Sequence, residues 1–433
     1  MREYAVVLLT AALVTFLATP VVRVVAVRLK MMAAVRDRDV HVIPTPRGGG
    51  VAMYLGVAAA MLVASQLPAL NKAFDINSQT VGVLIAGGLI CLLGVLDDRF
   101  GLDALTKLTG QIAAAGVMVL QGVQLSYVFL PVADIGTLIL GPDVGVPLTL
   151  LLTVLVVNAV NFIDGLDGLA AGVSAIAALA FFAYSYNLGL VGYGDVASAP
   201  ALITAVLAGA CLGFLPHNFN PARIFMGDSG SMLVGLMLSA AAVSATGQAD
   251  PQTFASAGSA GSAANLLPLT LPLLIPVAVL FIPSIDLLMA VVRRTRKGQS
   301  PFAPDKMHLH HRLLLIGHAH RRAVLIMYFW AALLSFGAVA LSITGGTAEV
   351  LVVVGSLLVV GVVAVLSPRA RRVAREQRMA EINAQRDRSR RAHPSARGPR
   401  TTEENALIAA ATPPPAHPPT PPAAPRAAGQ VAR

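Results

Sequence analysis

The chain has 433 residues, of which 56% are hydrophobic and only 12% are charged, and its mean hydropathy is +0.72. A composition this apolar excludes a water-soluble globular protein of this length. The net charge of +10 does not indicate a nucleic-acid partner, because the basic residues gather on one side of the predicted membrane.

Apolar runs long enough to cross a bilayer recur along the chain. Crossing about 30 Å of hydrocarbon requires roughly 20 residues in a helix. The first run has no small-residue cleavage pattern and is followed by several arginines, so we interpret it as a retained span and not as a signal peptide. The sequence predicts an all-α integral membrane protein with about eleven transmembrane helices, near residues 4–25, 50–69, 79–96, 105–124, 145–161, 168–187, 197–216, 229–246, 266–292, 322–343 and 348–366.

The distribution of basic residues predicts the orientation of these spans. If the N-terminus lies outside, only Arg2 and Lys72 fall on the outer side, and all other Lys and Arg residues lie in or at the edge of cytoplasmic segments. This asymmetry follows the positive-inside rule. The two cysteines, Cys91 and Cys211, fall inside predicted spans and supply no disulfide framework.

Three parts of the chain differ in composition. Residues 1–367 contain every predicted span and no polar stretch long enough to fold separately, so we expect one polytopic membrane domain. Residues 368–400 mix many arginines with acidic residues, as expected of a basic cytoplasmic segment near anionic head groups. Residues 401–433 are rich in Pro and Ala, and we expect them to be disordered.

Polar residues that could take part in catalysis or in substrate binding lie at the predicted cytoplasmic ends of the spans. Asp97 and Asp98 directly follow an apolar run, and adjacent carboxylates favour a divalent cation or a proton-accepting role. Lys107 follows nine residues after Asp98, where it could bind phosphate or simply extend to the interface. Asp228 stands at the start of an apolar run, so it could ligate a metal, cap a helix, or do both.

Two further groups of polar residues lie on the same predicted face. Asn158, Asn161, Asp164 and Asp167 recur at every third residue, a spacing that presents one polar edge along a helix or tight turn. The other group consists of histidines flanked by Lys306 and Arg312, namely His308, His310 and His311. A transition-metal site is one interpretation of the histidines. Pyrophosphate binding agrees better with the absence of cysteine and with the preference of Mg²⁺ for oxygen ligands.

Five motifs resemble those of a known family. They are PTPRGGG at 44–50, LDDRFGLDALTKLTGQ at 96–111, NAVNFIDGLDGLAAG at 158–172, FMGDSGSMLVG at 225–235 and HLHHRLL at 308–314. In this order, over residues 1–366, the chain is similar to the polyprenyl-phosphate N-acetylhexosamine-1-phosphate transferases, which include the bacterial WecA, TagO and MraY enzymes. The resemblance implies transfer of a sugar-1-phosphate from a UDP-amino sugar to a polyprenyl phosphate at the cytoplasmic face of the bacterial cell membrane.

The branch of the family follows from two of these motifs. The PR-x-GG and H-x-HH patterns resemble the WecA/TagO branch, which implies UDP-N-acetylglucosamine as the donor and undecaprenyl or decaprenyl phosphate as the acceptor, in the first membrane step of cell-wall polymer synthesis. Transfer of phospho-MurNAc-pentapeptide, the MraY reaction, is the alternative. Residues 38–41 read Arg-Asp-Val-His where the family often has Arg-Lys-Val-His, so no lysine is expected to bind phosphate there.

The resemblance also implies roles for individual residues. The cofactor would be Mg²⁺, with Mn²⁺ as the alternative, and its ligands would be Asp228 and then Asn161. Asp97 would be the base or would position the lipid phosphate, with support from Asp98. The remaining residues would bind the substrates. Lys107 would bind the donor phosphates, Asp167 the uracil edge, and Phe225 the uracil face. Asp164 would shape the nucleotide pocket, Asn158 would belong to the polar edge beside it, and His308, His310 and His311 would bind the pyrophosphate.

Some alternatives stay open at this point. A direct attack by the lipid phosphate and a two-step route through an aspartyl intermediate both agree with the residues. A homodimer is also compatible with the sequence. A membrane transporter or flippase is disfavoured, because the acidic residues lie at span ends and no inverted repeat is visible.

Overall fold

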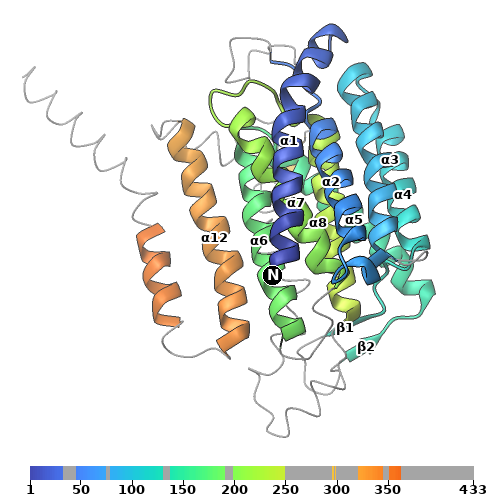
Figure 1. Cartoon of the computed structure of the whole chain (residues 1–433), viewed down its shortest axis with the longest axis vertical. Helices are drawn as coiled ribbons and strands as arrows, with labels where there is room; N and C mark the ends of the chain where they lie inside the picture. The colour runs from blue at the N-terminus through green and yellow to red at the C-terminus, as the bar shows by residue number, and fades with distance from the viewer. Residues whose placement is uncertain are drawn as a thin grey trace, which may run out of the picture. The chain divides into compact units, whose positions relative to one another are not determined.

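The computed structural model describes residues 1–32, 45–74, 79–129, 137–190, 198–248, 295–296, 298, 320–344 and 351–361. Within these ranges the chain is mostly helical (Figure 1), and eight helices are long and apolar enough to cross a membrane. They are α1 (Arg2–Arg28), α2 (Gly49–Gln66), α3 (Gln79–Phe100), α5 (Pro142–Ile163), α6 (Leu169–Leu190), α7 (Ala199–Asn218), α8 (Gly227–Gln248) and α12 (His320–Thr344). Two shorter apolar helices are α4 (Ala104–Leu120) and the segment Leu351–Gly361.

The structure confirms the prediction of an all-α integral membrane protein. Eight of the predicted spans correspond to helices long enough to cross a membrane, and the runs at 105–124 and 348–366 correspond to the two shorter helices. The run at 266–292 lies outside the described residues. The segments 368–400 and 401–433 lie outside them too. The described residues also contain a 3₁₀ turn, η1 (Asn71–Phe74), and a two-stranded antiparallel hairpin of β1 (Tyr127–Phe129) and β2 (Thr137–Ile139), in which Tyr127 pairs with Ile139.

Helix α8 lies at the centre of the bundle. It packs against α2, α3, α5 and α7. Every residue of its most apolar stretch is buried, whereas only 22% of the residues in the corresponding stretch of α1 are buried. The outward face of α1 is aliphatic, with Leu9, Leu13 and Leu17 each about 60% exposed, as expected of a helix that faces lipid. Helix α4 packs on α3 and α5, and α12 packs on α6.

The N-terminus of α8 is approached closely by two neighbouring helices. A Cβ atom at Gly50 of α2 would collide with the backbone of Gly230, and a Cβ atom at Gly94 of α3 would collide with the backbone of Ser229. Small residues at such crossings let helix backbones approach closely in a membrane. The two glycines therefore bring the start of α8 into contact with the start of α2 and the end of α3.

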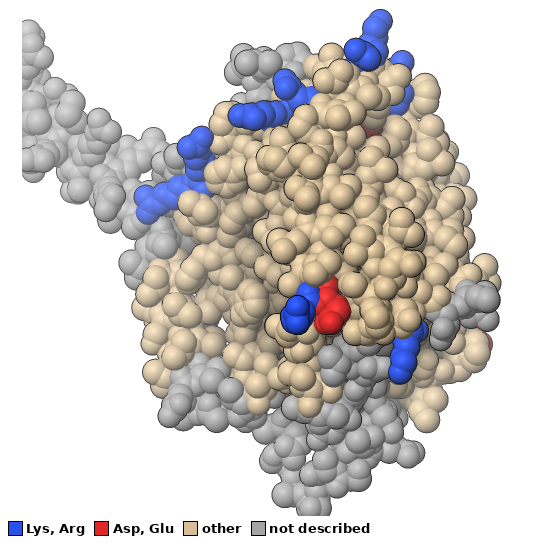
Figure 2. All heavy atoms as spheres, in the orientation of Figure 1, with Lys and Arg blue, Asp and Glu red and all other residues tan. Residues whose placement is uncertain are grey.

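Charge is concentrated at one end of the bundle. Figure 2 shows most Lys and Arg side chains of the visible face at its upper end, where α1 ends and α2 begins in Figure 1, whereas the broad middle is uncharged. The N-terminus of α1 and the β1–β2 hairpin lie toward the opposite end (Figure 1). An uncharged band between two polar ends agrees with a helix bundle that spans a bilayer.

Candidate active site

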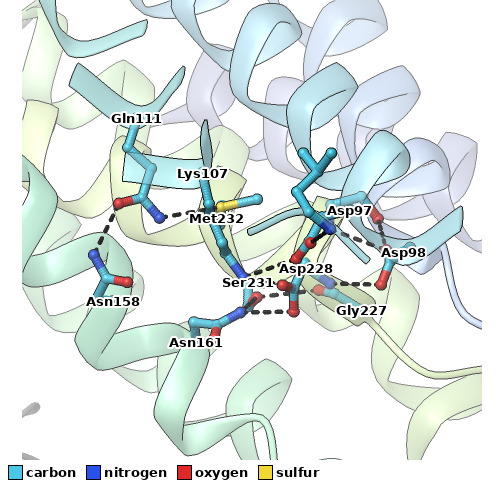
Figure 3. A network of polar contacts seen from close by, with 12 residues as sticks. Asp97, Asp98, Lys107, Gln111, Asn158, Asn161, Gly227, Asp228, Ser231 and Met232 are labelled. Atoms are coloured by element: carbon cyan, nitrogen blue, oxygen red, sulfur yellow. Dashed lines mark hydrogen bonds and ion pairs between the residues drawn. The ribbon is translucent and has the colours of Figure 1, made fainter. Parts of the chain in front are cut away.

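A lysine between two carboxylates forms the centre of a polar cluster at one end of four helices (Figure 3). Lys107 Nζ donates a hydrogen bond to Asp97 Oδ2 at 2.9 Å and forms an ion pair with Asp228 Oδ2. Asn161 Nδ2 donates to Asp228 Oδ1 at 2.9 Å and to Ser231 Oγ at 2.8 Å. The cluster thus unites α3, α4, α5 and α8, which lie far apart in the sequence.

The tight turn between α3 and α4 places Lys107 beside Asp97. Asp97 Oδ1 accepts a hydrogen bond from the backbone N–H of Leu102 at 2.8 Å. Asp103 caps α4 by accepting from the N–H groups of Leu105 and Thr106, both at 3.0 Å. An N-cap of this kind fixes where a helix begins, so Lys107, in the first turn of α4, points back toward the end of α3.

Asp98 does not face the lysine but the start of α8. Its Oδ1 accepts from the N–H of Asp228 at 3.0 Å, and its Oδ2 accepts from the N–H and the Oγ of Ser229 at 3.2 and 3.0 Å. A carboxylate at a helix N-terminus satisfies free N–H groups and interacts favourably with the helix dipole. Asp98 therefore fixes the backbone that carries Asp228.

Asn158 lies one helical turn before Asn161 and belongs to a separate polar pair within the bundle. Its Nδ2 donates to Gln111 Oε1 at 2.9 Å and to the carbonyl of Val154 at 2.8 Å, and Gln111 Nε2 contacts Met232 Sδ at 3.3 Å. Gln111 is only 1% exposed. Gln111 has no predicted role, although an amide in an apolar run, four residues after Lys107, is the signal that could have identified it.

Asp164 caps the C-terminus of α5, close to the same cluster. Burial raises the pKa of Asp164 to about 7, and the negative charges of Asp228 and Asp98 add to this effect, whereas Arg47 opposes it. The backbone N–H of Gly227 also donates to the Asp164 carboxyl. The charges of Arg47 and Asp164, from two different motifs, therefore lie close enough to the start of α8 to interact electrostatically there.

Asp167 is buried beneath the loop between α7 and α8. It is 2% exposed, and its Oδ2 accepts from Asn220 Nδ2 at 2.9 Å and from the N–H of Ala222 at 3.1 Å. Asn218 strengthens this connection, since its Oδ1 accepts from the N–H of Gly168 and its Nδ2 donates to the carbonyl of Ile224, both at 3.0 Å. Asp167 thus shapes the loop, and its contact with a uracil edge stays a prediction.

Phe225 lies in the same loop and is tied to the glycine-rich motif. Its N–H donates to the carbonyl of Pro46 at 2.9 Å, and its carbonyl accepts from the N–H of Gly49 at 3.0 Å. The side chain is half-buried. The structure therefore joins the PTPRGGG and FMGDSG segments beside the cluster. His308, His310 and His311 lie outside the described residues, so their pyrophosphate role stays a prediction.

The fold and the cluster define a multi-pass membrane protein that holds cationic and acidic side chains together at one end of its helices. Residues 80–246 match the family model described as "Glycosyl transferase family 4". The chain is 52% identical over 373 residues to a decaprenyl-phosphate N-acetylglucosaminephosphotransferase of Mycolicibacterium smegmatis, covering 86% of this chain and 90% of that protein.

Two more distant relatives represent the two branches of the family. A probable undecaprenyl-phosphate N-acetylglucosaminyl 1-phosphate transferase of Bacillus subtilis is 30% identical over 353 residues, covering 79% of this chain and 86% of that protein. A phospho-N-acetylmuramoyl-pentapeptide-transferase of Desulforudis audaxviator is 35% identical over 339 residues, with coverages of 74% and 92%. The chain belongs to the family of polyprenyl-phosphate N-acetylhexosamine-1-phosphate transferases.

Proposed function

We propose that the chain transfers N-acetylglucosamine-1-phosphate from UDP-N-acetylglucosamine to decaprenyl or undecaprenyl phosphate, giving polyprenyl-diphospho-N-acetylglucosamine and UMP. The observation that carries this proposal is the cluster of Asp97, Lys107, Asn161 and Asp228 at one end of the membrane helices. Similarity to decaprenyl-phosphate N-acetylglucosaminephosphotransferases over 86% of the chain supports both the sugar and a decaprenyl acceptor. The product would begin the membrane stage of cell-wall polymer synthesis.

The cluster would face the cytoplasm of a bacterial cell. It lies at the cytoplasmic end assigned by the positive-inside rule, with the N-terminus outside. A site at this interface can receive a water-soluble nucleotide sugar from the cytosol and a lipid phosphate from the inner leaflet. Binding a water-soluble substrate and a lipid substrate together explains why the charged residues of the cluster lie at the ends of apolar helices and not in their middle.

The donor set of the cluster suits a magnesium ion. Mg²⁺ prefers oxygen ligands in an octahedral arrangement, and proteins bind it through one or two carboxylates together with substrate phosphates. Asp228 and Asp97 supply the carboxylates, and Asn161 supplies an amide oxygen if its side chain turns over from its present contact. Among the described residues no group of three His, Cys, Asp or Glu side chains could hold a metal, so donor phosphates would complete the ligand set. Mn²⁺ would suit the same ligands.

The reaction would be an in-line displacement at the phosphorus atom linked to the sugar. An oxygen of the polyprenyl phosphate attacks this phosphorus, and the bond to the UMP phosphate oxygen breaks. The lipid phosphate is already mostly ionised at neutral pH, because its second pKa is about 6. No strong base is therefore needed, so Asp97 would position the lipid phosphate through the ion that it helps to hold, and Lys107 would bind the donor phosphates. The bound ion would neutralise charge that develops on the leaving phosphate.

A reconstituted assay tests the proposal. The purified full-length chain in detergent, with polyprenyl phosphate and Mg²⁺, should release UMP from UDP-N-acetylglucosamine and form the lipid-linked product. Asp228→Asn should lower the rate by about 100-fold or more, since the main charged ligand is lost. Asp143 is an exposed carboxylate in the first turn of α5, at the end of that helix opposite to Asn161, so Asp143→Asn should keep wild-type activity. Turnover of UDP-MurNAc-pentapeptide instead would favour the second branch, and near-normal activity of Asp228→Asn would refute the assigned site.

A further inference from the structure

The two carboxylates that would bind the metal are already partly neutralised by a cation that belongs to the chain. The ammonium group of Lys107 contacts Oδ2 of both Asp97 and Asp228. The three side chains are only 19%, 12% and 25% exposed, in the order Lys107, Asp97, Asp228. Two carboxylates this close would repel one another if no cation lay between them.

A divalent ion and this ammonium group would compete for the same oxygen atoms. Mg²⁺ prefers carboxylate oxygens, so Asp97 and Asp228 would hold the ion with oxygen atoms that Lys107 Nζ now contacts. Two positive charges in direct contact with the same pair of oxygens repel each other strongly in a partly buried site. The ion and the ammonium therefore cannot bind these two oxygens at the same time.

We infer that Lys107 is an internal competitor of the metal ion, and that metal binding releases its ammonium group to the phosphates of the nucleotide sugar. The inference rests on the metal site proposed above and adds a coupling between two binding events. Without the donor, the ion displaces Lys107 at a cost in free energy. With the donor, the released ammonium gains a phosphate partner, which offsets that cost.

The local structure allows this exchange without any change in the helix. The backbone of Lys107 is held in the first turn of α4 by the Asp103 cap, whereas its four-carbon side chain can rotate. Its sequence neighbours Leu105 and Leu108 are exposed and do not enclose it. Because binding free energies are reciprocal, the donor must also strengthen metal binding by the same factor by which the metal strengthens donor binding.

This coupling makes an unusual prediction for a lysine in an active site. Removal of Lys107 should abolish sugar transfer and yet increase the affinity of the protein for the metal. Lys107→Met should bind Mn²⁺ on the order of tenfold more tightly than the wild type in the absence of donor, within the usual range of coupling between sites. A lysine that only binds phosphate would leave metal affinity without donor unchanged.

The test measures free Mn²⁺ by electron paramagnetic resonance during titration of the full-length protein in detergent, without polyprenyl phosphate, so that no turnover occurs. UDP-N-acetylglucosamine should tighten Mn²⁺ binding by a larger factor in the wild type than in Lys107→Met, where the direct contacts between donor phosphates and the ion are the only coupling that remains. Lys107→Arg keeps the cation and should remain as weak as the wild type without donor. Arg99→Met removes an exposed cation of α3 that stacks over Phe100, and it should match the wild type.

The possible failures can be told apart. Mn²⁺ binding by Lys107→Met that is equal to or weaker than that of the wild type overturns the competition. Lys107→Gln serves as a second neutral variant if Lys107→Met does not fold. If Asp228→Asn binds Mn²⁺ as well as the wild type, or if no variant binds it, the cluster is not the metal site, and both the inference and the proposed metal chemistry are wrong.

Discussion

Asp98→Ala should separate the positioning of Asp228 from the chemistry itself. The substitution removes an acceptor for three hydrogen bonds from the first residues of α8, with lengths of 3.0, 3.2 and 3.0 Å. Loss of a helix cap costs about 0.5–2 kcal/mol. A partly buried carboxylate at a helix N-terminus can contribute up to about 2 kcal/mol more through the dipole. We therefore expect a loss of about 1–4 kcal/mol in the free energy of unfolding.

Asp98→Asn should have a milder effect because the amide oxygen can still accept a hydrogen bond from α8. We expect it to lose about 1 kcal/mol of stability and roughly tenfold in activity, whereas Asp98→Ala should lose on the order of 100-fold because Asp228 is displaced. The expected order of activity is wild type, then Asp98→Asn, then Asp98→Ala. Affinity for Mn²⁺ should decrease in the same order.

The two cysteines provide an assay for stability. Cys91 and Cys211 are 5% and 0% exposed and are not in disulfides, so a thiol-reactive dye should report unfolding on heating. The melting temperature of Asp98→Ala should fall by about 5 °C or more, and that of Asp143→Ala should hardly change. If Asp98→Asn and Asp98→Ala were equally inactive while both melted and bound Mn²⁺ like the wild type, Asp98 would act in the chemistry and not through α8.

Two further predictions concern the packing around the cluster. Gly94→Ala places a methyl group against the backbone of α8 and should lower the free energy of unfolding by about 1–3 kcal/mol. The measurement is a lower melting temperature together with lower activity. As a control, Gly116→Ala, where nothing lies within 4 Å of the added methyl group, should be neutral or slightly stabilising. Gln111→Leu removes the acceptor of the Asn158 amide and should lower the free energy of unfolding by about 1–3 kcal/mol. Its rate of UMP release should decrease far less than that of Asp228→Asn. An equal decrease would place Gln111 among the groups that contact the substrate.

The sequence predicted the helices better than it predicted their ends. The run at 105–124 becomes α4, which begins at Ala104 but stops at Leu120. Gly122 then adopts a positive φ of 85° and the chain enters the β1–β2 hairpin. Hydropathy reports how apolar a segment is, but it does not report where its backbone hydrogen bonds change from helix to turn. The two strands have three residues each, which is too short for an alternating pattern to reveal.

The convergence of the site could be predicted because it depends only on topology. Alternating spans bring the end of α3 and the starts of α4 and α8 to one face, so Asp97, Lys107 and Asp228 were expected to lie together. The resemblance predicts only that Asp98 supports Asp97. That Asp98 binds the start of α8 could not be predicted, because adjacent residues of a helix point in directions about 100° apart and only the packing of α8 decides which of them faces it. For the same reason the burial of Asp167 beneath the loop after α7 is a tertiary feature.

The arrangement of charge around α8 has a physical rationale. The proposed ion would need one ligand whose position does not vary, and α8, the helix with the most buried stretch, is well suited to carry that ligand. Asp228 begins that helix, and Asp98 holds its backbone from outside. Lys107, the charge that would change partner under the inference above, comes from the shorter and more exposed helix α4. In the proposed mechanism, a fixed anion on the central helix and a rotatable cation on α4 would allow metal and nucleotide sugar to bind and leave without any movement of the bundle.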